Sequence, residues 1–217
     1  YDPTVIVNKL PRVDRILITD IDNTLIGDDE ALEEFKRRLA EFPENVGFGI
    51  ATGRNYTETL DILESHGVQR PDLIVCSVGT EIYYGERLIE DRSWSKRINY
   101  EWNADKIQEV LAGIEGVDAQ SEERQSRFKI SYILDMERAP SPNVLRRILR
   151  EHGCSVKMVV SCGMFLDIIP IRAGDGLAIR HLAFRWGLPP ERLLIVGDSG
   201  NDEEMLKGNT LGVVVSN

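Results

Sequence analysis

Cysteine is scarce in this chain of 217 residues, which contains only Cys76, Cys154 and Cys162. Their number is odd and their spacing matches no metal-ligand pattern, so neither a disulfide framework nor a structural zinc site is expected. Reduced thiols in a cytoplasmic protein are the simplest interpretation. The sequence also has no apolar run as long as a membrane span, and we expect no signal peptide.

Basic residues are outnumbered too, because 26 lysines and arginines stand against 36 aspartates and glutamates, and the formal net charge is −10. A chain of this charge is poorly suited to binding nucleic acid or an anionic membrane, and neither partner is expected. Hydrophobic residues make up 42% of the chain and charged residues 29%, which is ordinary for a globular protein. The length allows one large domain, or a core with a smaller insert.

Two parts of the chain contain short apolar segments that alternate with amphipathic helices. This alternation predicts an α/β fold with a doubly wound parallel sheet that is covered on both faces. The predicted strands are residues 15–20, 46–52, 72–77, 164–170, 193–198 and 211–216, and the predicted helices are residues 28–42, 55–67 and 176–187, with a short one near 202–207.

The segment between these parts has a different order of predicted helices and strands. It begins with a predicted hairpin around Gly85 and continues with two helices among several strands, which predicts an α+β cap inserted into the core. We therefore expect a core domain formed by residues 15–84 and 164–217, and a cap domain formed by residues 85–163. Within the cap, helices are predicted at 104–114 and 141–153, and strands at 117–120, 127–135 and 155–160.

Residues 1–14, which include two prolines, are predicted to form an extended linker. The chain begins with Tyr1 and ends on a predicted strand. A segment excised from a longer polypeptide is the expected explanation of both ends, and processing or trimming is the alternative.

Acidic and polar residues gather where three predicted strands end. In an open parallel sheet, the carboxyl ends of the strands form the edge at which ligands bind. Four carboxylates at one edge repel one another unless a cation lies among them, and hard oxygen ligands favour Mg²⁺, which also binds a phosphate oxygen of a substrate. The alternative is that these acids only cap loops and turns, and three such motifs in order argue against it. The motifs are "TDIDNT" with Asp20, Asp22 and Thr24, "ATGR" with Thr52, Gly53 and Arg54, and "VGDSGND" with Asp198, Asn201 and Asp202.

The order Asp20-Ile21-Asp22-Asn23-Thr24, with "ATGR" and "GDSGND" after it, resembles the haloacid-dehalogenase (HAD) superfamily of phosphatases. The resemblance implies a Rossmann-like HAD core with a cap, and Asp20 as the nucleophile that forms an aspartyl-phosphate. It implies that Asp22 is the acid and then the base, and that Thr52, Gly53 and Asn201 bind the phosphate. It also implies a Mg²⁺ ion whose protein ligands are Asp20, the backbone carbonyl of Asp22, Asp198 and, through water, Asp202.

A narrower resemblance extends from about Arg15 to the end of the chain. The segments "LITDIDNTLIGD", "FKISY", "SCGMFLDIIP" and "GDSGNDEEML" look like sucrose-phosphate phosphatase, or the phosphatase-like domain that follows the glycosyltransferase part of sucrose-phosphate synthases. This implies sucrose-6-phosphate as the ligand, a role in sucrose biosynthesis, and a fused glycosyltransferase domain before Tyr1. Another sugar phosphate, such as trehalose phosphate, would keep the mechanism and change only the cap.

Several further residues are candidates for binding the sugar. Lys129 falls where the family contacts its substrate, with Arg54, Gln125 and Arg127 as further candidates. The alternative for Lys129 is a solvated lysine on an amphipathic strand. Trp94 and Trp102 could stack on a sugar ring, but we expect them to pack within the protein instead.

One departure from the family pattern concerns charge. The family has a lysine in the glycine turn before a helix, and here that place holds Asp175, between Gly174 and Gly176. Loss of one well-placed donor costs a factor of about 10² to 10³ in rate. Arg172 could take the vacated place. Two hypotheses remain: a Mg²⁺-dependent phosphatase that is impaired or rescued by another cation, and a phosphosugar-binding or regulatory domain that hydrolyses little.

Overall fold

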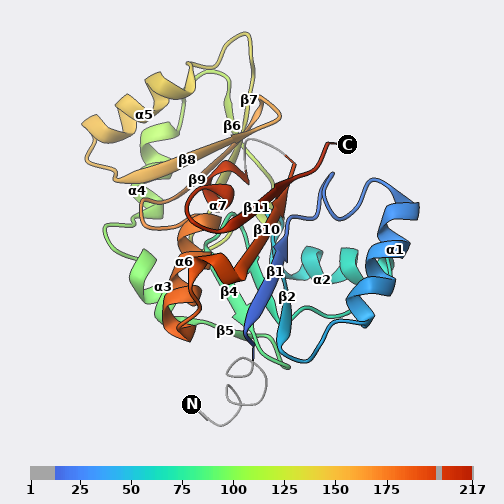
Figure 1. The fold of residues 1–217 in the computed structure, drawn as a ribbon. Helices are drawn as coiled ribbons and strands as arrows, with labels where there is room; N and C mark the ends of the chain where they lie inside the picture. The colour runs from blue at the N-terminus through green and yellow to red at the C-terminus, as the bar shows by residue number, and fades with distance from the viewer. Residues whose placement is uncertain (1–12, 199–201, 217) are drawn as a thin grey trace. The chain divides into compact units, whose positions relative to one another are not determined.

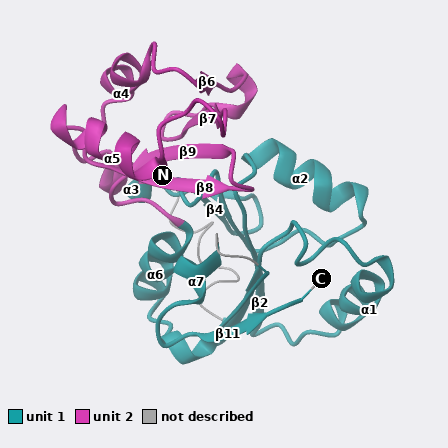
Figure 2. Ribbon diagram, turned by 90° about the horizontal axis from the view of Figure 1, so that it is seen from above, with its two compact units in different colours: residues 1–94, 175–217 teal, residues 95–174 magenta. Residues whose placement is uncertain are grey.

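The computed structural model describes residues 13–198 and 202–216. The linker predicted for residues 1–14 therefore lies outside the described residues, except for its last two. The chain divides into two compact units (Figure 2), which are residues 1–94 with 175–217, and residues 95–174. Within the described ranges, none of the helices has both the length and the apolar character that crossing a membrane requires.

The first unit is built on a sheet of seven strands in the order β11-β10-β1-β2-β3-β4-β5. The five strands from β11 to β3 are parallel, and β4 and β5 add an antiparallel hairpin at one edge. The strands are β1 (Arg15–Thr19), β2 (Val46–Ala51), β3 (Leu73–Cys76), β4 (Glu81–Tyr84), β5 (Ile89–Glu90), β10 (Leu193–Gly197) and β11 (Leu211–Val214).

Helices cover both faces of this sheet, which confirms the doubly wound α/β fold (Figures 1 and 2). Helices α1 (Asp29–Ala40) and α2 (Tyr56–Ser65) lie on one face, and α6 (Asp175–Trp186) and α7 (Glu203–Leu206) lie on the other. The unit also contains the short 3₁₀ turn η3 (Pro190–Arg192).

The ends of α1 and α2 follow from local chemistry. The Asp28 carboxylate accepts the N–H of Ala31 at 2.9 Å, and the Asn55 side chain accepts the N–H of Glu58 at 2.8 Å, so each helix begins at a capping side chain. These helices seal an apolar cluster against the strands. Its buried members are Leu17, Ile21, Leu25, Leu32, Leu39, Phe48, Ile50, Leu63 and Val68.

The second unit is a four-stranded antiparallel sheet in the order β6-β7-β9-β8, with its own helices. Alternate residues of β7 and β9 face a core that α4 and α5 complete; for example Tyr132 and Leu166 are buried there. The elements are α4 (Ala104–Leu111), β6 (Val117–Ala119), the 3₁₀ turn η2 (Glu122–Arg124), β7 (Ile130–Leu134), α5 (Pro142–Glu151), β8 (Val156–Ser161) and β9 (Phe165–Pro170), and α3 (Arg92–Ile98) begins in the first unit and ends in the second.

The prediction that the segment 164–170 joins the parallel core sheet is wrong, because β9 pairs antiparallel with β7 and β8. A continuous apolar run does not distinguish a central strand of an antiparallel sheet from a strand of a parallel sheet. The hairpin predicted around Gly85 forms, but it extends the core sheet. The two units accordingly meet at Trp94/Ser95 and Gly174/Asp175, later in the chain than the expected boundaries at 84/85 and 163/164.

Candidate functional site

Three carboxylates converge at the carboxyl edge of the core sheet. Asp20 follows β1 and Asp198 follows the neighbouring strand β10, and the Asp20 N–H donates to the Val196 carbonyl at 3.0 Å. Carboxylate oxygens of Asp20, Asp198 and Asp202 all lie within 4.8 Å of one another. The strand ends therefore bring together three of the four residues expected to bind the metal.

The position of Asp202 depends on a glycine. The Asp202 carboxylate accepts the N–H of Asp198 at 2.9 Å, and it lies so close to β10 that a Cβ at Gly197 would be 2.6 Å from its atoms. Any side chain at Gly197 would displace the carboxylate. The glycine of the "VGDSGND" motif is thus explained by the close approach of Asp202 to the backbone.

The electrostatics of this cluster suit a cation. Burial, which is the largest cause, and the negative charges of Asp202, Asp22 and Asp198 together raise the pKa of Asp20 to about 7, against the lowering effect of the Ile21 N–H. The folded chain therefore holds a carboxylate that is costly to ionise alone. Hard oxygen donors in a crowded acidic group are the ligand set that Mg²⁺ prefers, and the residues present fit that ion.

Asp22, the expected acid and base, lies two residues further and is half exposed. It forms a bidentate ion pair with Arg54, whose Nε and Nη2 donate to the two carboxylate oxygens at 2.9 and 2.7 Å. The hydrogen bond to Asp22 raises the pKa of the Arg54 guanidinium. The Thr24 hydroxyl of the same motif lies 3.5 Å from a carboxylate oxygen of Asp198, at the long limit of a hydrogen bond.

The loop Thr52–Arg54 follows β2 and is held firmly at its first residue. Thr52 is buried, its N–H donates to the Val75 carbonyl at 2.9 Å, and its hydroxyl accepts the N–H of Arg54 at 3.3 Å. Gly53 is exposed, and a Cβ there would meet only Val78, at 3.8 Å. Packing within the protein therefore gives no reason for glycine at this position.

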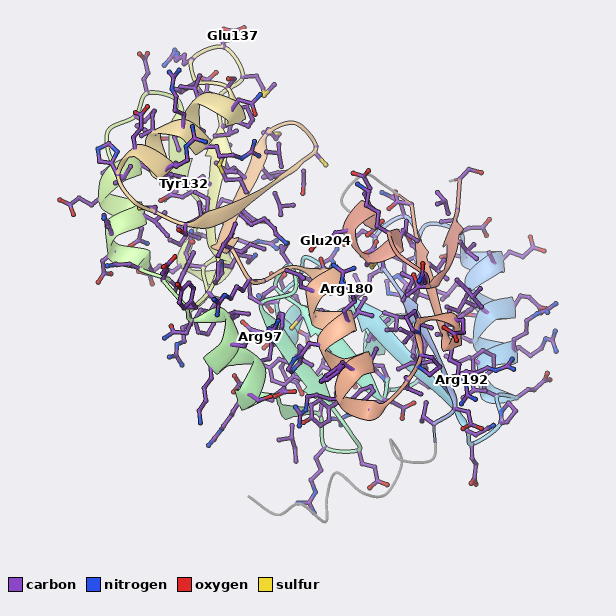
Figure 3. The ribbon with its side chains drawn as sticks, turned by 60° about the vertical axis from the view of Figure 1, so that its left-hand side comes forward. Arg97, Tyr132, Glu137, Arg180, Arg192 and Glu204 are labelled. Atoms are coloured by element: carbon purple, nitrogen blue, oxygen red, sulfur yellow. The ribbon has the colours of Figure 1, made fainter. Side chains whose placement is uncertain are left out.

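Asp175 is the first residue of α6, where a negative charge is favourable to the helix dipole. The next residue must be glycine, because a Cβ at Gly176 would lie 2.3 Å from the carbonyl oxygen of Glu204. The first turn of α6 therefore lies against α7, which begins directly after Asp202. Arg180 and Glu204 join the same two helices, with Nη2 3.7 Å from Oε1 (Figure 3).

In the second unit, two of the residues expected to bind the sugar are engaged by the protein itself. Lys129 is 6% exposed, so the alternative of a solvated lysine is wrong, and its ammonium lies 3.9 Å from Oδ1 of Asp167. The Gln125 amide donates to the carbonyls of Gln120 and Ser131 and accepts the N–H of Ser131 at 2.8 Å. The Ser131 hydroxyl donates to Asp167 at 2.5 Å.

The remaining candidates are placed as follows. The Arg172 guanidinium lies over the Tyr100 ring, 3.6 Å from its centroid, and that of Arg127 lies over the Phe128 ring at 4.8 Å. The indole N–H of Trp102 donates to the Arg127 carbonyl at 3.0 Å. Asn201, expected to bind the phosphate, lies outside the described residues.

Two features were not anticipated from the sequence. Asp167 pairs with Lys129 and Ser131, and the signal for it was an acid in the middle of an apolar strand. The turn Ser77–Gly79 contacts the loop Thr52–Arg54, since the N–H groups of Ser77 and Val78 donate to the Arg54 and Thr52 carbonyls. Nothing in the sequence except Gly79 indicated that turn.

Comparisons with known proteins identify the family of the chain. The family model described as Sucrose-6F-phosphate phosphohydrolase matches residues 13–217. A probable sucrose-phosphatase 3a of Arabidopsis thaliana is 32% identical in an alignment 219 positions long, which covers 95% of this chain and 51% of that protein. A mannosylfructose-phosphate phosphatase of Agrobacterium fabrum is 28% identical, over 94% of this chain and 83% of that protein.

Among solved structures, the sucrose-phosphatase from Synechocystis sp. PCC6803, in complex with sucrose and phosphate, is similar with a TM-score of 0.85 and 33% sequence identity. The match covers 94% of this chain and 83% of that one. The chain spans about half the length of the plant sucrose-phosphatases that it matches. The chain belongs to the Sucrose-6F-phosphate phosphohydrolase family, within the haloacid-dehalogenase superfamily.

Proposed function

We propose that this chain is a Mg²⁺-dependent phosphatase domain that hydrolyses a phosphosugar, with sucrose-6-phosphate as the substrate. The observation that carries the proposal is the convergence of Asp20, Asp198 and Asp202 within 4.8 Å at the edge where Arg54 reaches Asp22. Such a cluster is unfavourable unless positive charge enters it, and a phosphate monoester with a divalent ion is a ligand that fits.

The chemistry follows from the positions of the carboxylates. A carboxylate oxygen of Asp20 attacks phosphorus, an aspartyl-phosphate forms, and the bond from phosphorus to the sugar oxygen breaks. Asp22 gives its proton to the leaving sugar oxygen. Asp22 then takes a proton from a water molecule that attacks the phosphorus, which releases inorganic phosphate and restores Asp20.

The other residues bind and orient the phosphoryl group. The Thr52 hydroxyl and the amide of Gly53 donate to its oxygens, and Arg54 exchanges its contact with Asp22 for one with the phosphate, which leaves Asp22 available for proton transfer. Asn201 is proposed as a further phosphate ligand. Asp20, Asp198, the Asp22 carbonyl and, through water, Asp202 would hold Mg²⁺, whose charge offsets that of the acids and the phosphate when it is bound.

Asp175 favours a second candidate function, which is a phosphosugar-binding or regulatory domain that hydrolyses little. An acid in place of the lysine of the family adds negative charge where the incoming phosphate is negative. A different substrate is a third candidate, because a mannosylfructose-phosphate phosphatase also matches most of the chain. Trehalose phosphate belongs to the same alternative.

Two wider proposals rest on the family resemblance. The domain acts in the cytoplasm in sucrose biosynthesis, and it is the phosphatase-like part of a sucrose-phosphate synthase whose glycosyltransferase domain precedes it. In the cap, Lys129, with Gln125 as a weaker candidate, contacts the sugar.

One assay tests the function. Phosphate release from sucrose-6-phosphate is measured with Mg²⁺ for the wild type, Asp175→Lys and Asp20→Asn, with trehalose-6-phosphate and mannosylfructose-phosphate as comparison substrates. We expect weak release by the wild type, an increase of about 10² in Asp175→Lys, and none in Asp20→Asn. Equal rates for the wild type and Asp175→Lys would contradict the charge argument. Release by Asp20→Asn at the wild-type rate would refute the mechanism.

A further inference from the structure

The turn after β3 has an unusual backbone. Ser77, Val78 and Gly79 follow one another with φ of 53°, 58° and 72°. A left-handed conformation is rare for a β-branched residue such as Val78, because its Cβ crowds the following carbonyl oxygen. Such conformations persist where the surrounding structure enforces them, and they concentrate at functional sites. Two questions follow: which part of the protein the turn positions, and which side chains keep the turn in this conformation.

The turn holds the proposed phosphate loop. The Ser77 N–H donates to the Arg54 carbonyl at 2.7 Å, and the Val78 N–H donates to the Thr52 carbonyl at 3.3 Å. The Val78 side chain is the nearest group to a Cβ placed on Gly53. Because a trans peptide is planar, a fixed Thr52 carbonyl also fixes the Gly53 N–H, which points the opposite way. The left-handed turn thus sets the direction of an amide donor in the phosphate loop.

Two buried side chains hold the turn. The Ser77 carbonyl accepts the N–H and the hydroxyl of Thr80, at 3.3 and 2.9 Å. The Gly79 carbonyl accepts the indole N–H of Trp94 at 3.1 Å. Trp94 is 1% exposed and Thr80 is fully buried, so water does not compete for these bonds.

Trp94 is itself fixed within the first unit. Its backbone N–H donates to Oδ1 of Asp91 at 3.2 Å, and its ring lies 5.0 Å from the ring of His181, measured between centroids. Asp91 is buried and forms an ion pair with Arg185 of α6. Contacts with Asp91 and with His181 of α6 therefore fix the position of the indole, whose N–H points at the Gly79 carbonyl.

We propose that Trp94 is a positioning residue for phosphate binding, whose indole N–H keeps the Ser77–Gly79 turn left-handed and so aims the Gly53 amide at the phosphate. This inference rests on the proposed function. The competing explanation is that Trp94 only fills the core. The two explanations depend on different parts of the side chain: filling of the core requires the ring, and positioning requires its N–H.

The test replaces the indole by a ring without a donor. Trp94→Phe keeps an aromatic side chain and removes the bond to Gly79, and Trp102→Phe is the matched control, since it removes the same kind of bond, to the Arg127 carbonyl, in the second unit. Hydrogen exchange of the Ser77 and Val78 amides is measured by NMR in the ligand-free chain. Binding of inorganic phosphate with Mg²⁺ is measured by calorimetry.

In Trp94→Phe we expect both amides to exchange about tenfold faster and phosphate to bind about tenfold more weakly, as the loss of one buried hydrogen bond allows. In Trp102→Phe both quantities stay at the wild-type values, whatever the loss of thermal stability. If Trp94→Phe does not fold, Thr80→Val tests whether the turn governs phosphate binding, because it removes the hydroxyl bond to the Ser77 carbonyl with little change in shape.

Unchanged exchange in Trp94→Phe would overturn the inference, and so would faster exchange with unchanged phosphate affinity. A wild type that neither binds phosphate nor releases it from sucrose-6-phosphate would overturn the proposed function and, with it, a phosphate-positioning role. In that case the exchange rates alone would still show whether Trp94 holds the turn. The two failures are therefore distinguishable.

Discussion

Each unit contains a cluster of buried or half-buried charged side chains, and the two clusters differ in the signs of their charges. In the first unit, the carboxylates of Asp20, Asp198 and Asp202 share one sign and lie within 4.8 Å. In the second unit, Lys129 lies 3.9 Å from Asp167, which also accepts a hydrogen bond from Ser131. The carboxylates of the first cluster repel one another, whereas the charges of the second cluster are opposite and attract each other. The two units therefore differ in the sign of the charges that surround a buried charged group.

Removal of one member of the second cluster gives the largest expected effect. Asp167→Asn leaves the Lys129 ammonium buried without its counter-charge, and loss of one partner of a buried ion pair costs about 3 kcal/mol or more. We expect the free energy of unfolding, measured with urea, to fall by that amount.

The control is a double-mutant cycle with Lys129→Met, which removes the charge that Asp167 neutralises. The double variant should lose much less stability than the sum of the two single variants, because residues in one charge network are not additive. A loss below about 0.5 kcal/mol in Asp167→Asn would mean that the pair is a surface-like contact, and the contrast between the two units would then disappear.

Binding of Mg²⁺ to the first cluster should increase the stability of the fold, whereas removal of a charge from the second cluster lowers it. Since burial and the neighbouring acids raise the pKa of Asp20 to about 7, the protonated form stabilises the metal-free fold, and this stabilisation is lost as the pH rises through 7. Mg²⁺ at 100 times its Kd stabilises by about 2.7 kcal/mol. We expect the Mg²⁺-induced increase in Tm to be clearly larger at pH 8 than at pH 5, where the proton competes with the ion.

Asp198→Asn is the matched control for this experiment, because it removes one carboxylate and its charge from the cluster. The Mg²⁺-induced increase in Tm should be largely lost in that variant, while Asp167→Asn keeps it. The same increase in Asp198→Asn as in the wild type would place the ion elsewhere.

The sequence predicted those parts of the molecule that depend on local pattern. Strands and helices with clear periodicity formed, and the acids of the "TDIDNT" and "VGDSGND" motifs met because parallel strands end at one edge. The sequence did not predict the pairing of β9, since an apolar run is compatible with either sheet. It also missed the left-handed turn, because the indole N–H that bonds the Gly79 carbonyl comes from Trp94, 15 residues further along the chain.

Substitution of Gly53 is expected to disturb the fold least, and it therefore separates an effect on phosphate binding most clearly from an effect on stability. In Gly53→Ala the new methyl group would meet only Val78, at 3.8 Å, so we expect the free energy of unfolding to change by less than about 0.5 kcal/mol. Phosphate should nevertheless bind about tenfold more weakly, because the methyl group occupies the space where a ligand oxygen approaches the amide.

Gly49→Ala is the opposite control: its Cβ would lie 3.2 Å from Leu73 and 3.3 Å from Ile18, so stability falls by about 1 kcal/mol or more while the folded protein keeps its phosphate affinity. If Gly53→Ala binds phosphate as the wild type does, the loop after β2 is not the phosphate site, and the like-charged cluster beside it would need a different ligand.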